Sequence, residues 1–367
     1  MENIINVNVK NNKPYDVVIR NDFTELNSFI INLYPSKKTK LCIIADKNVS
    51  DIYGEGIIKI LREFYDHVDC IPLVLGEVNK SLETVSKCYS FMIEKKYNRK
   101  DAVLALGGGI CGDIAGFVAA SYMRGIGFIQ IPTTLLSMVD SSSGGKTGVN
   151  FDDYKNMIGA FKMPGLVYIN TETLNTLSDR EYSSGMAEVL KAGLIKDGNF
   201  YEWLISNFTF INDRDPEYVS EMISKSVNIK RLYVEKDPYE QNERAILNLG
   251  HTAGHALEKY TDFKYSHGEC VALGCIVAAY ISWKKEYLSM EEFYEIRDMF
   301  VPFSLPISLE NIDVDKIISY MRSDKKNTQD NIRYILLKKI GKGIISEDVT
   351  ENEISKALEA INYNPGD

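Results

Sequence analysis

The stretch that decides the fold is DAVLALGGGICGDIAGFVAASYM, residues 101–123. Its first six residues form an apolar, partly β-branched run that is typical of a buried parallel strand. The turn that follows places Gly107, Gly109 and Gly112 in the spacing G-x-G-x-x-G, and a helical segment comes next. This order predicts a strand–turn–helix unit whose helix N-terminus can bind a pyrophosphate. Because the motif lies beyond residue 100, we expect a Rossmann-like fold of variant topology.

Outward from this unit, short apolar runs alternate with helical stretches through the first 170 residues. The alternation predicts an α/β domain with a mostly parallel sheet. Successive helices follow, which predict a mainly α-helical second domain, so the expected domains are residues 1–170 and 171–367. The expected strands are 4–9, 16–19, 41–45, 70–74, 102–106, 128–131, 166–169 and 332–337, and the expected helices are 24–33, 49–65, 81–94, 178–197, 198–207, 216–235, 245–260, 268–286, 289–300 and 352–361.

The composition argues against several classes of protein. A hydrophobic content of 45% and a charged content of 25% are ordinary for a globular protein. A net charge of −9 argues against nucleic acid or an anionic membrane as the partner. We expect no signal peptide and no membrane span, since the sequence has neither pattern. Six cysteines without C-x-x-C spacing predict reduced thiols in a cytoplasmic protein.

Three of the four histidines, His251, His255 and His267, stand close together in LNLGHTAGHALEKYTDFKYSHGECVAL, residues 247–273. Imidazole is the commonest protein ligand for zinc-like ions and also moves protons near neutral pH. A spacing of four puts His251 and His255 on one face of a helix. Thr252 stands where the His-Glu-x-x-His metalloprotease pattern has glutamate. From these residues alone, metal binding and a pair of structural histidines both remain open.

A third informative stretch is IPTTLLSMVDSSSGGKTGVN, residues 131–150. Gly145, Lys146 and Thr147 resemble the end of a Walker A motif, but that motif needs glycine where Asp140 stands. The sequence therefore disfavours an ATP-hydrolysing P-loop. An acid and a lysine on either side of a Ser/Gly-rich turn are suited to binding polar substrate groups, whereas a polar loop without function is the plainer alternative.

Six segments together resemble the 3-dehydroquinate synthase family, which belongs to the sugar-phosphate cyclase superfamily. They are GGGICGDIAGFVAASYMRG, IPTTLLSMVDSSSGGKTGVN, KNMIGAF, GMAEVLKAGLI, LNLGHTAGHALE and SHGECVALG. The segments occur in order and at compatible separations, and the similarity runs from about residue 46 to residue 341. A single segment of this kind is weak, whereas six in register are specific.

The resemblance implies an α/β NAD-binding domain, a mainly helical metal- and substrate-binding domain, an active site between them and a homodimer. It implies a carbon–oxygen lyase that converts 3-deoxy-D-arabino-heptulosonate 7-phosphate into 3-dehydroquinate and phosphate in the shikimate pathway. The implied chemistry is transient oxidation by NAD, β-elimination of phosphate, reduction and intramolecular aldol closure. The cofactors would be NAD and a divalent ion, Zn²⁺ or Co²⁺, and the substrate an anionic sugar phosphate with a carboxylate.

Matched residue by residue, the resemblance implies one carboxylate and two imidazoles, Glu188, His251 and His267, as metal ligands. It gives His255 to the substrate phosphate instead of the metal. Asp46 follows an apolar run, and an acid there favours NAD over NADP. The positions implied for NAD are Asp46, Asn48, Glu77, Lys80, Gly109, Asp113, Thr133, Thr134, Lys146, Lys155 and Thr176.

The implied substrate carries a phosphate and a carboxylate, so an acidic chain needs locally placed cations to bind it. Arg124 resembles an arginine that reaches the phosphate site of the partner subunit. The positions implied for catalysis are Asp140, Lys146, Lys191, Lys230, Arg244, Asn248 and His255, and those implied for further substrate contacts are Arg124, Asn156 and one of Lys325 or Lys326.

The departures from the family pattern are small: Asn170, Ser143 and Cys270 replace residues that are usually aspartate, apolar and alanine. Three alternatives remain. A sister cyclase of the 2-deoxy-scyllo-inosose or valiolone type would act on sugar phosphates without a carboxylate, and Arg244, Asn248 and His255 argue against it. A glycerol-type dehydrogenase would release NADH. A non-enzymatic module would have lost the chemistry, although every metal and substrate position holds a competent residue.

Overall fold

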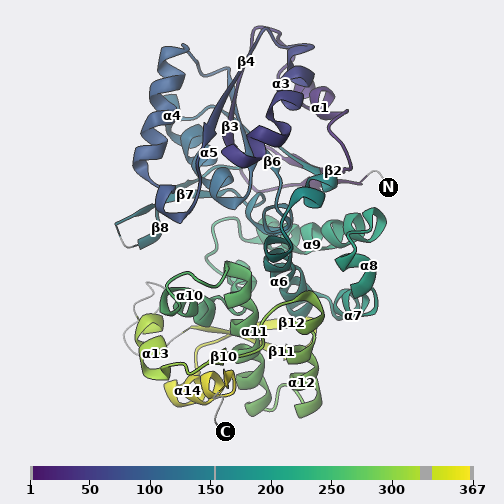
Figure 1. Cartoon of the computed structure of the whole chain (residues 1–367), viewed down its shortest axis with the longest axis vertical. Coiled ribbons are helices and arrows are strands. Elements are labelled where there is room, and N and C mark those ends of the chain that lie inside the picture. The colour runs from purple at the N-terminus through teal and green to yellow at the C-terminus, as the bar shows by residue number, and fades with distance from the viewer. Residues whose placement is uncertain (1–2, 153, 323–332, 364–367) are drawn as a thin grey trace. The chain divides into compact units, whose positions relative to one another are not determined.

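The computed structural model describes residues 3–152, 154–322 and 333–363. The chain forms two compact units, Met1–Leu177 with Val219–Tyr239 and Ser178–Tyr218 with Glu240–Asp367. The sequence placed the boundary near residue 170, whereas the first change of unit falls between residues 177 and 178. Helix α9 (Pro216–Lys236), expected in the second half, has nearly all of its length in the first unit. Figure 1 traces the chain through both units.

The first unit is built on a seven-stranded sheet in the order β1-β2-β9-β6-β5-β3-β4. Only β1 and β2 pair antiparallel, and each of the other neighbouring strands pairs parallel. All six residues of β5 are buried, as its apolar sequence predicts for a central strand. The strands are β1 (Asn3–Val7), β2 (Tyr15–Arg20), β3 (Lys40–Asp46), β4 (His67–Leu73), β5 (Ala102–Gly107), β6 (Gly127–Pro132) and β9 (Leu166–Asn170).

Alternate residues of the central strands face opposite sides of the sheet and form two cores. Ile43 and Leu104 pack on the side covered by α1 (Leu26–Leu33) and α3 (Glu55–Arg62). Ile44 and Val103 pack on the other side, under α4 (Leu82–Glu94) and α5 (Gly109–Ser121). The upper part of Figure 1 shows this layer order, with helices on both faces of the sheet.

A two-stranded hairpin of β7 (Lys146–Phe151) and β8 (Tyr154–Phe161) packs against α5. The sequence did not predict it, because Gly148 and Gly159 face each other across the pair and glycine disfavours strands. A Cβ at Gly148 would lie 2.6 Å from the carbonyl oxygen of Ile158, so this close pairing requires glycine.

The second unit is mainly helical, and α11 (His267–Lys284) runs through its centre. Buried along most of its length, α11 packs against α6, α10, α12, α14 and β11. The remaining elements are α6 (Asp179–Lys196), α7 (Gly198–Ser206), α8 (Phe208–Asn212), η6 (Glu243–Asn248), α10 (His251–Tyr260), α12 (Met290–Asp298), α13 (Val314–Arg322), α14 (Glu351–Glu359), β10 (Leu309–Glu310), β11 (Tyr334–Lys339), β12 (Lys342–Ser346) and β13 (Asn362–Tyr363).

The expected fold class, a parallel-dominated α/β part and a mainly helical part, is confirmed. The sequence missed α8, α13 and β12, and it expected one helix over residues 245–260. That helix is interrupted, because Gly250 adopts a left-handed φ of 78° and α10 begins only at His251. Within residues 3–152, 154–322 and 333–363, no helix has both the length and the apolar character needed to cross a bilayer.

Candidate metal and nucleotide sites

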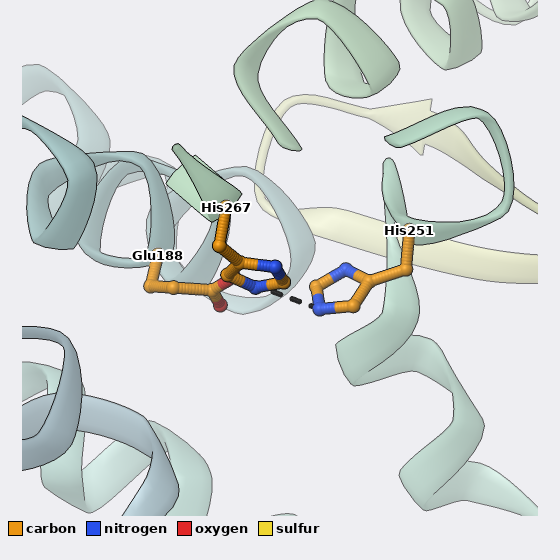
Figure 2. Close-up of side chains that lie close together, drawn as sticks. All are labelled: Glu188, His251 and His267. Carbon is orange, nitrogen blue, oxygen red and sulfur yellow. Dashed lines mark ion pairs between the residues drawn. The ribbon is translucent and has the colours of Figure 1, made fainter. Parts of the chain in front are cut away.

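Three side chains of the second unit converge on one point (Figure 2). The Nε2 atoms of His267 and His251 lie 3.4 Å and 3.6 Å from the same oxygen, Oε1 of Glu188. Glu188 comes from the middle of α6, whereas the two histidines are the first residues of α10 and α11. Potential ligand atoms of all three residues lie within 4.8 Å of one another. The spacing fits a shared cation.

Local structure fixes each histidine at the start of its helix. Gly250, in the left-handed conformation, is the N-cap of α10 and turns the chain into that helix at His251. Ser266 caps α11, since its side chain accepts a hydrogen bond from the Glu269 amide while the Glu269 carboxylate accepts one from the Ser266 amide. His267 is therefore presented from a stable helix end.

The surroundings of Glu188 favour the ionised carboxylate that a metal ligand needs. Burial alone would raise its pKa, but the nearby Lys191 ammonium and the His267 ring outweigh burial and hold the pKa well below the usual value. The carboxylate forms an ion pair with Lys191, yet in the described chain neither of its oxygens accepts a hydrogen bond. A buried carboxylate of this kind has lone pairs available for a cation.

The two imidazoles have opposite electrostatic surroundings. Burial and the nearby Lys191 ammonium lower the pKa of His251 well below its ordinary value, which favours the neutral ring. Burial would also lower the pKa of His267, but Glu188 and Glu258 raise it to about 9. A neutral imidazole can coordinate a metal directly, whereas His267 between two carboxylates binds either a proton or a metal ion.

Two groups of side chains could hold a metal ion, and they share His267. The first group is Glu188, His251 and His267, and the second is His255, Glu258 and His267. Glu258 Oε1 lies 2.6 Å from His267 Nδ1, which is a hydrogen-bond distance. Because the carboxylate oxygen accepts, Nδ1 carries the proton of this hydrogen bond. The first group fits a divalent ion better, because both of its Nε2 atoms face a carboxylate oxygen that makes no hydrogen bond.

The other residues predicted in this unit lie close to the same point or next to it in the chain. Lys191 is 2% exposed and pairs with Glu188 one helical turn earlier. The ring of His255 lies 5.3 Å from that of His251, between centroids. Arg244 is buried in η6, which packs against α6. Asn248, at the end of η6, donates a hydrogen bond to Glu240 Oε1 over 2.7 Å.

Sequence reasoning missed Glu240 and Glu258. Glu258 is three residues after His255, a spacing that places both on one face of α10, and this was the signal that could have indicated it. No sequence pattern indicates Glu240. It precedes η6, and its hydrogen bond to Asn248 forms because the chain turns between the two residues.

The residues predicted to bind NAD gather in the first unit at the carboxyl ends of its parallel strands. Ligands of open α/β sheets bind at this edge. Asp46 ends β3 and accepts hydrogen bonds from the amides of Asn48 and Val49, at 2.9 Å and 3.4 Å. Thr133 and Thr134 follow β6 directly, Glu77 and Lys80 follow β4, Gly109 and Asp113 follow β5, and Thr176 follows β9.

The first turn of α5 offers a suitable cradle for a dinucleotide. A Cβ at Gly109 would lie 3.0 Å from Ser141 Oγ, so glycine keeps this part of the turn uncrowded. Within the described residues, the buried hydroxyls of Ser141 and Thr133 have no hydrogen-bond partner. Free amides at a helix N-terminus beside such hydroxyls suit an anionic pyrophosphate.

Lys80 connects the cradle to the hairpin. Its ammonium, in a residue that is 4% exposed, donates to Asp113 Oδ2 and to Asn156 Oδ1, both at 2.5 Å. On the same side, Glu77 accepts a hydrogen bond from Asn150 and lies 3.7 Å from Lys155 Nζ. Asn156, which was expected to contact the substrate, therefore accepts a hydrogen bond from Lys80, which was expected to contact NAD.

Further predicted residues lie elsewhere in the first unit. Lys230 on α9 donates to the Asp140 carbonyl at 2.5 Å and to its carboxylate at 2.7 Å. Lys146 is exposed at the start of β7. Arg124 is exposed and has a left-handed φ of 67°. Lys325 and Lys326 lie outside the described residues.

Comparison with known proteins covers nearly the whole chain. Residues 70–184 match the family model described as 3-dehydroquinate synthase N-terminal, and residues 185–327 match the one described as 3-dehydroquinate synthase C-terminal. A 3-dehydroquinate synthase of Ruminiclostridium cellulolyticum is 40% identical over 352 residues, which are 96% of this chain and 97% of that protein.

Two solved structures have the same fold over almost their entire length. The 2-epi-5-epi-valiolone synthase of Streptomyces hygroscopicus subsp. jinggangensis 5008, with NAD⁺ and Zn²⁺ bound, superposes with a TM-score of 0.88 at 26% identity. It covers 97% of this chain and 98% of that one. A 2-deoxy-scyllo-inosose synthase complexed with carbaglucose-6-phosphate, NAD⁺ and Co²⁺ gives a TM-score of 0.87 at 25% identity, covering 97% and 99%.

Proposed function

The chain belongs to the 3-dehydroquinate synthase family, and on that premise we propose that it converts 3-deoxy-D-arabino-heptulosonate 7-phosphate into 3-dehydroquinate and phosphate. This reaction makes the protein a carbon–oxygen lyase of the shikimate pathway. The observation that carries the proposal is the convergence of Glu188, His251 and His267 beside the buried Lys191. Those three ligands, with coordination positions left for substrate, form a catalytic zinc arrangement.

A divalent ion, Zn²⁺ or Co²⁺, fits this set, as both ions occur in the solved relatives. When bound, the ion would lower the pKa of the substrate hydroxyl to be oxidised. Glu188 supplies the charge of the site, and Lys191 offsets that charge and keeps the carboxylate ionised. The imidazoles hold their Nδ1 atoms against Leu249 O and Glu258, which leaves both Nε2 atoms for the ion.

NAD fits the carboxyl edge of the sheet in the first unit and would accept a hydride from the substrate and return it within one turnover. Asp46 would suit ribose hydroxyls, since it is the acidic last residue of β3, at the carboxyl end of a parallel strand. The amides of the first turn of α5 and the unpartnered hydroxyls of Thr133 and Ser141 are suited to the pyrophosphate. Lys80 keeps Asp113 and Asn156 in fixed positions around this cradle.

The substrate is an anionic sugar phosphate with a carboxylate, and buried cations support its binding. Lys191, Lys230 and Arg244 are each less than a tenth exposed, at 2%, 7% and 2%. Cations held in place before the substrate arrives stabilise developing charge without reorganising. His255 and Asn248 would complete the contacts, with Asp140, Lys146 and one of Lys325 or Lys326.

We expect a homodimer in which Arg124 reaches the phosphate site of the partner subunit. Met123 and Arg124 are consecutive non-glycine residues with positive φ, 49° and 67°. Such a conformation costs about 1–3 kcal/mol per residue and persists where the surroundings require it. The protein would work in the cytoplasm, in keeping with six free cysteines, five of them buried.

The sister cyclases remain the second candidate, because two of them share the fold at TM-scores of 0.88 and 0.87. Their identity of 25–26% is well below the 40% shared with a 3-dehydroquinate synthase over a similar length. The higher identity favours the carboxylate-bearing substrate.

A phosphate-release assay with three substrates tests the proposal. We expect release from the heptulosonate phosphate with catalytic amounts of NAD and without net NADH, and background release from glucose 6-phosphate and sedoheptulose 7-phosphate. Metal-stripped protein, with activity recovered on adding Zn²⁺, is the control. Preference for glucose 6-phosphate or sedoheptulose 7-phosphate would assign the chain to the sister cyclases, and NADH accumulation would indicate a dehydrogenase.

A further inference from the structure

We infer that Glu258 is a positioning residue that fixes the tautomer and orientation of His267, so that Nε2 of this ring faces the metal position. The inference rests on the proposed metal site of Glu188, His251 and His267. Glu258 is not one of those three predicted ligands, and it would act on the metal position through its hydrogen bond to His267.

The geometry of His267 leaves one assignment of its two nitrogens. Nδ1 lies 2.6 Å from Glu258 Oε1, and Nε2 lies 3.4 Å from Glu188 Oε1. A carboxylate hydrogen bond at Nδ1 keeps the proton on that nitrogen and leaves the lone pair of Nε2 for a metal. A ring flip would break the hydrogen bond to Glu258 and would turn Nε2 away from Glu188.

Glu258 is itself held in place. Its residue is 3% exposed, and it lies on α10 where that helix packs tightly against α11. A Cβ at Gly254, one turn before Glu258, would come within 3.1 Å of the carbonyl oxygen of Cys270. The close approach of the two helices brings Glu258 to the ring that begins α11. A buried carboxylate that turned away from the imidazole would lose this hydrogen bond without water to replace it. The contact therefore holds the carboxylate and the ring in one orientation.

The two histidines of the site have different partners at Nδ1. His251 faces a backbone carbonyl, Leu249 O, at 3.1 Å, whereas His267 faces a carboxylate side chain, Glu258 Oε1, at 2.6 Å. Outer partners that orient a histidine ligand in this way typically contribute about 10–100-fold to metal affinity. Only the partner of His267 can be removed by substitution, which makes the inference testable.

The test is Co²⁺ titration of metal-free full-length protein, followed by the d–d absorption of the bound ion. We expect Glu258→Gln to weaken Co²⁺ binding by about 10–100-fold and to change the d–d spectrum, while the urea midpoint of the metal-free protein stays near that of the wild type. Glu292→Gln is the matched control. Its carboxylate accepts a hydrogen bond from the Ser289 amide at the start of α12, a helix that carries no predicted ligand. Co²⁺ affinity of Glu292→Gln should stay within about twofold of the wild type, below the range for outer partners.

The outcomes separate this inference from the proposed function. If Co²⁺ binding is lost in Glu188→Gln and His251→Ala but unchanged in Glu258→Gln, the inference is wrong and the metal site stands. If Glu188→Gln and His251→Ala both leave Co²⁺ binding unchanged, the metal site is wrong.

Nitrogen-15 spectra of the histidine rings in zinc-loaded wild-type protein provide a second measurement that needs no variant. We expect His267 to be protonated at Nδ1 and bound to zinc through Nε2. Coordination through Nδ1 would overturn the inference, because the ion would then occupy the other candidate group, His255, Glu258 and His267.

Discussion

Glu188 and Lys191 form an ion pair one helical turn apart on α6, and their side chains are only 2% and 3% exposed. A buried pair adds little net stability, because desolvation offsets most of the attraction between the charges. Two apolar residues of similar size would pack as well, so stability alone does not explain the pair. A carboxylate that is ionised, buried and free of hydrogen bonds is instead what a divalent ion requires.

Glu188→Gln should therefore abolish metal retention while leaving NAD affinity nearly unchanged. We expect zinc binding at least about 100-fold weaker, a larger loss than for an outer partner. Metal content by mass spectrometry and NAD binding by calorimetry are the measurements. The metal assignment would be wrong if zinc content stayed at the wild-type level.

The same substitution should lower stability, since Lys191 loses its carboxylate partner. Breaking a buried pair costs about 3–5 kcal/mol. The double variant Glu188→Gln with Lys191→Met is the control, because it removes both charges. It should recover most of the stability in urea unfolding and none of the zinc, which separates the ligand role from folding.

At this scale, the sequence revealed part of the site. Clustering of His251, His255 and His267 indicated a candidate metal site but could not rank the three rings. Family resemblance then assigned Glu188, which is 63 positions before His251 in the chain. Glu258 was missed, because a glutamate on a helix is usually a solvated charge, and only the packing of α10 on α11 buries it.

Among the elements, the approach of α11 to α6 sets the distance between the ligands. Gly268, next to His267, donates its amide to Ser184 Oγ at 3.0 Å, and Ser184 is one turn before Glu188. A Cβ at Gly268 would overlap the carbonyl group of Ser184, which is backbone and cannot rotate away. The two helices can meet this closely only with glycine at this position.

Gly268→Ala should push the two helices apart and enlarge the metal site. We expect a loss of about 1–3 kcal/mol of stability, as for overpacked cores, together with weaker Co²⁺ binding. Gly56→Ala on α3 is the matched control, because its Cβ would meet nothing within 4 Å. It should stabilise the protein by about 0.5–1 kcal/mol, as expected for glycine in a helix. Equal urea midpoints for the two variants would contradict the role given to Gly268.

Elements with strong periodicity were predicted well, and the exceptions have physical causes. All seven strands of the main sheet were expected, and the buried parallel strands most clearly, because they read as continuous apolar runs. The hairpin of β7 and β8 was missed, since its glycine pair hides the strand pattern. The break before α10 depends on a left-handed Gly250, whose Cβ would contact Cys275 and Val271 in α11. The residues around Gly250 in the sequence do not reveal this contact, because its partners belong to another helix.

For the whole molecule, the path of the chain departs most from the sequence-based expectation. The expected second half began near residue 170, but residues 219–239 return to the first unit. The contacts that tie them there include Lys230 to Asp140, Glu235 to the amide of Asn8, and Tyr239 edge-on to Phe161. A helix far along the chain cannot be assigned to a unit by periodicity, since an amphipathic face shows only that a partner exists.

This path predicts that residues 1–177 will not fold alone into a stable domain. Helix α9 buries Val219, Met222, Ile223, Val227 and Val234, and from Val219 onward it belongs to the first unit, so the fragment lacks part of that unit. We expect the 1–177 fragment to aggregate or to unfold without a cooperative thermal transition. Joining residues 216–239 to it through a flexible linker should restore cooperative unfolding and NAD binding.

The fused fragment carrying Lys230→Met is the control for the ion pair within this arrangement. Its apolar stripe is intact, but Asp140 loses the Lys230 ammonium, which lies 2.7 Å from its carboxylate. The Asp140 side chain is 31% exposed, so water replaces part of the lost interaction, and we expect only about 1 kcal/mol of destabilisation. Differential scanning calorimetry of the three fragments distinguishes the contributions. A cooperative transition and full NAD affinity in residues 1–177 alone would show that α9 is dispensable for the first unit, and the division of the chain described above would then be wrong.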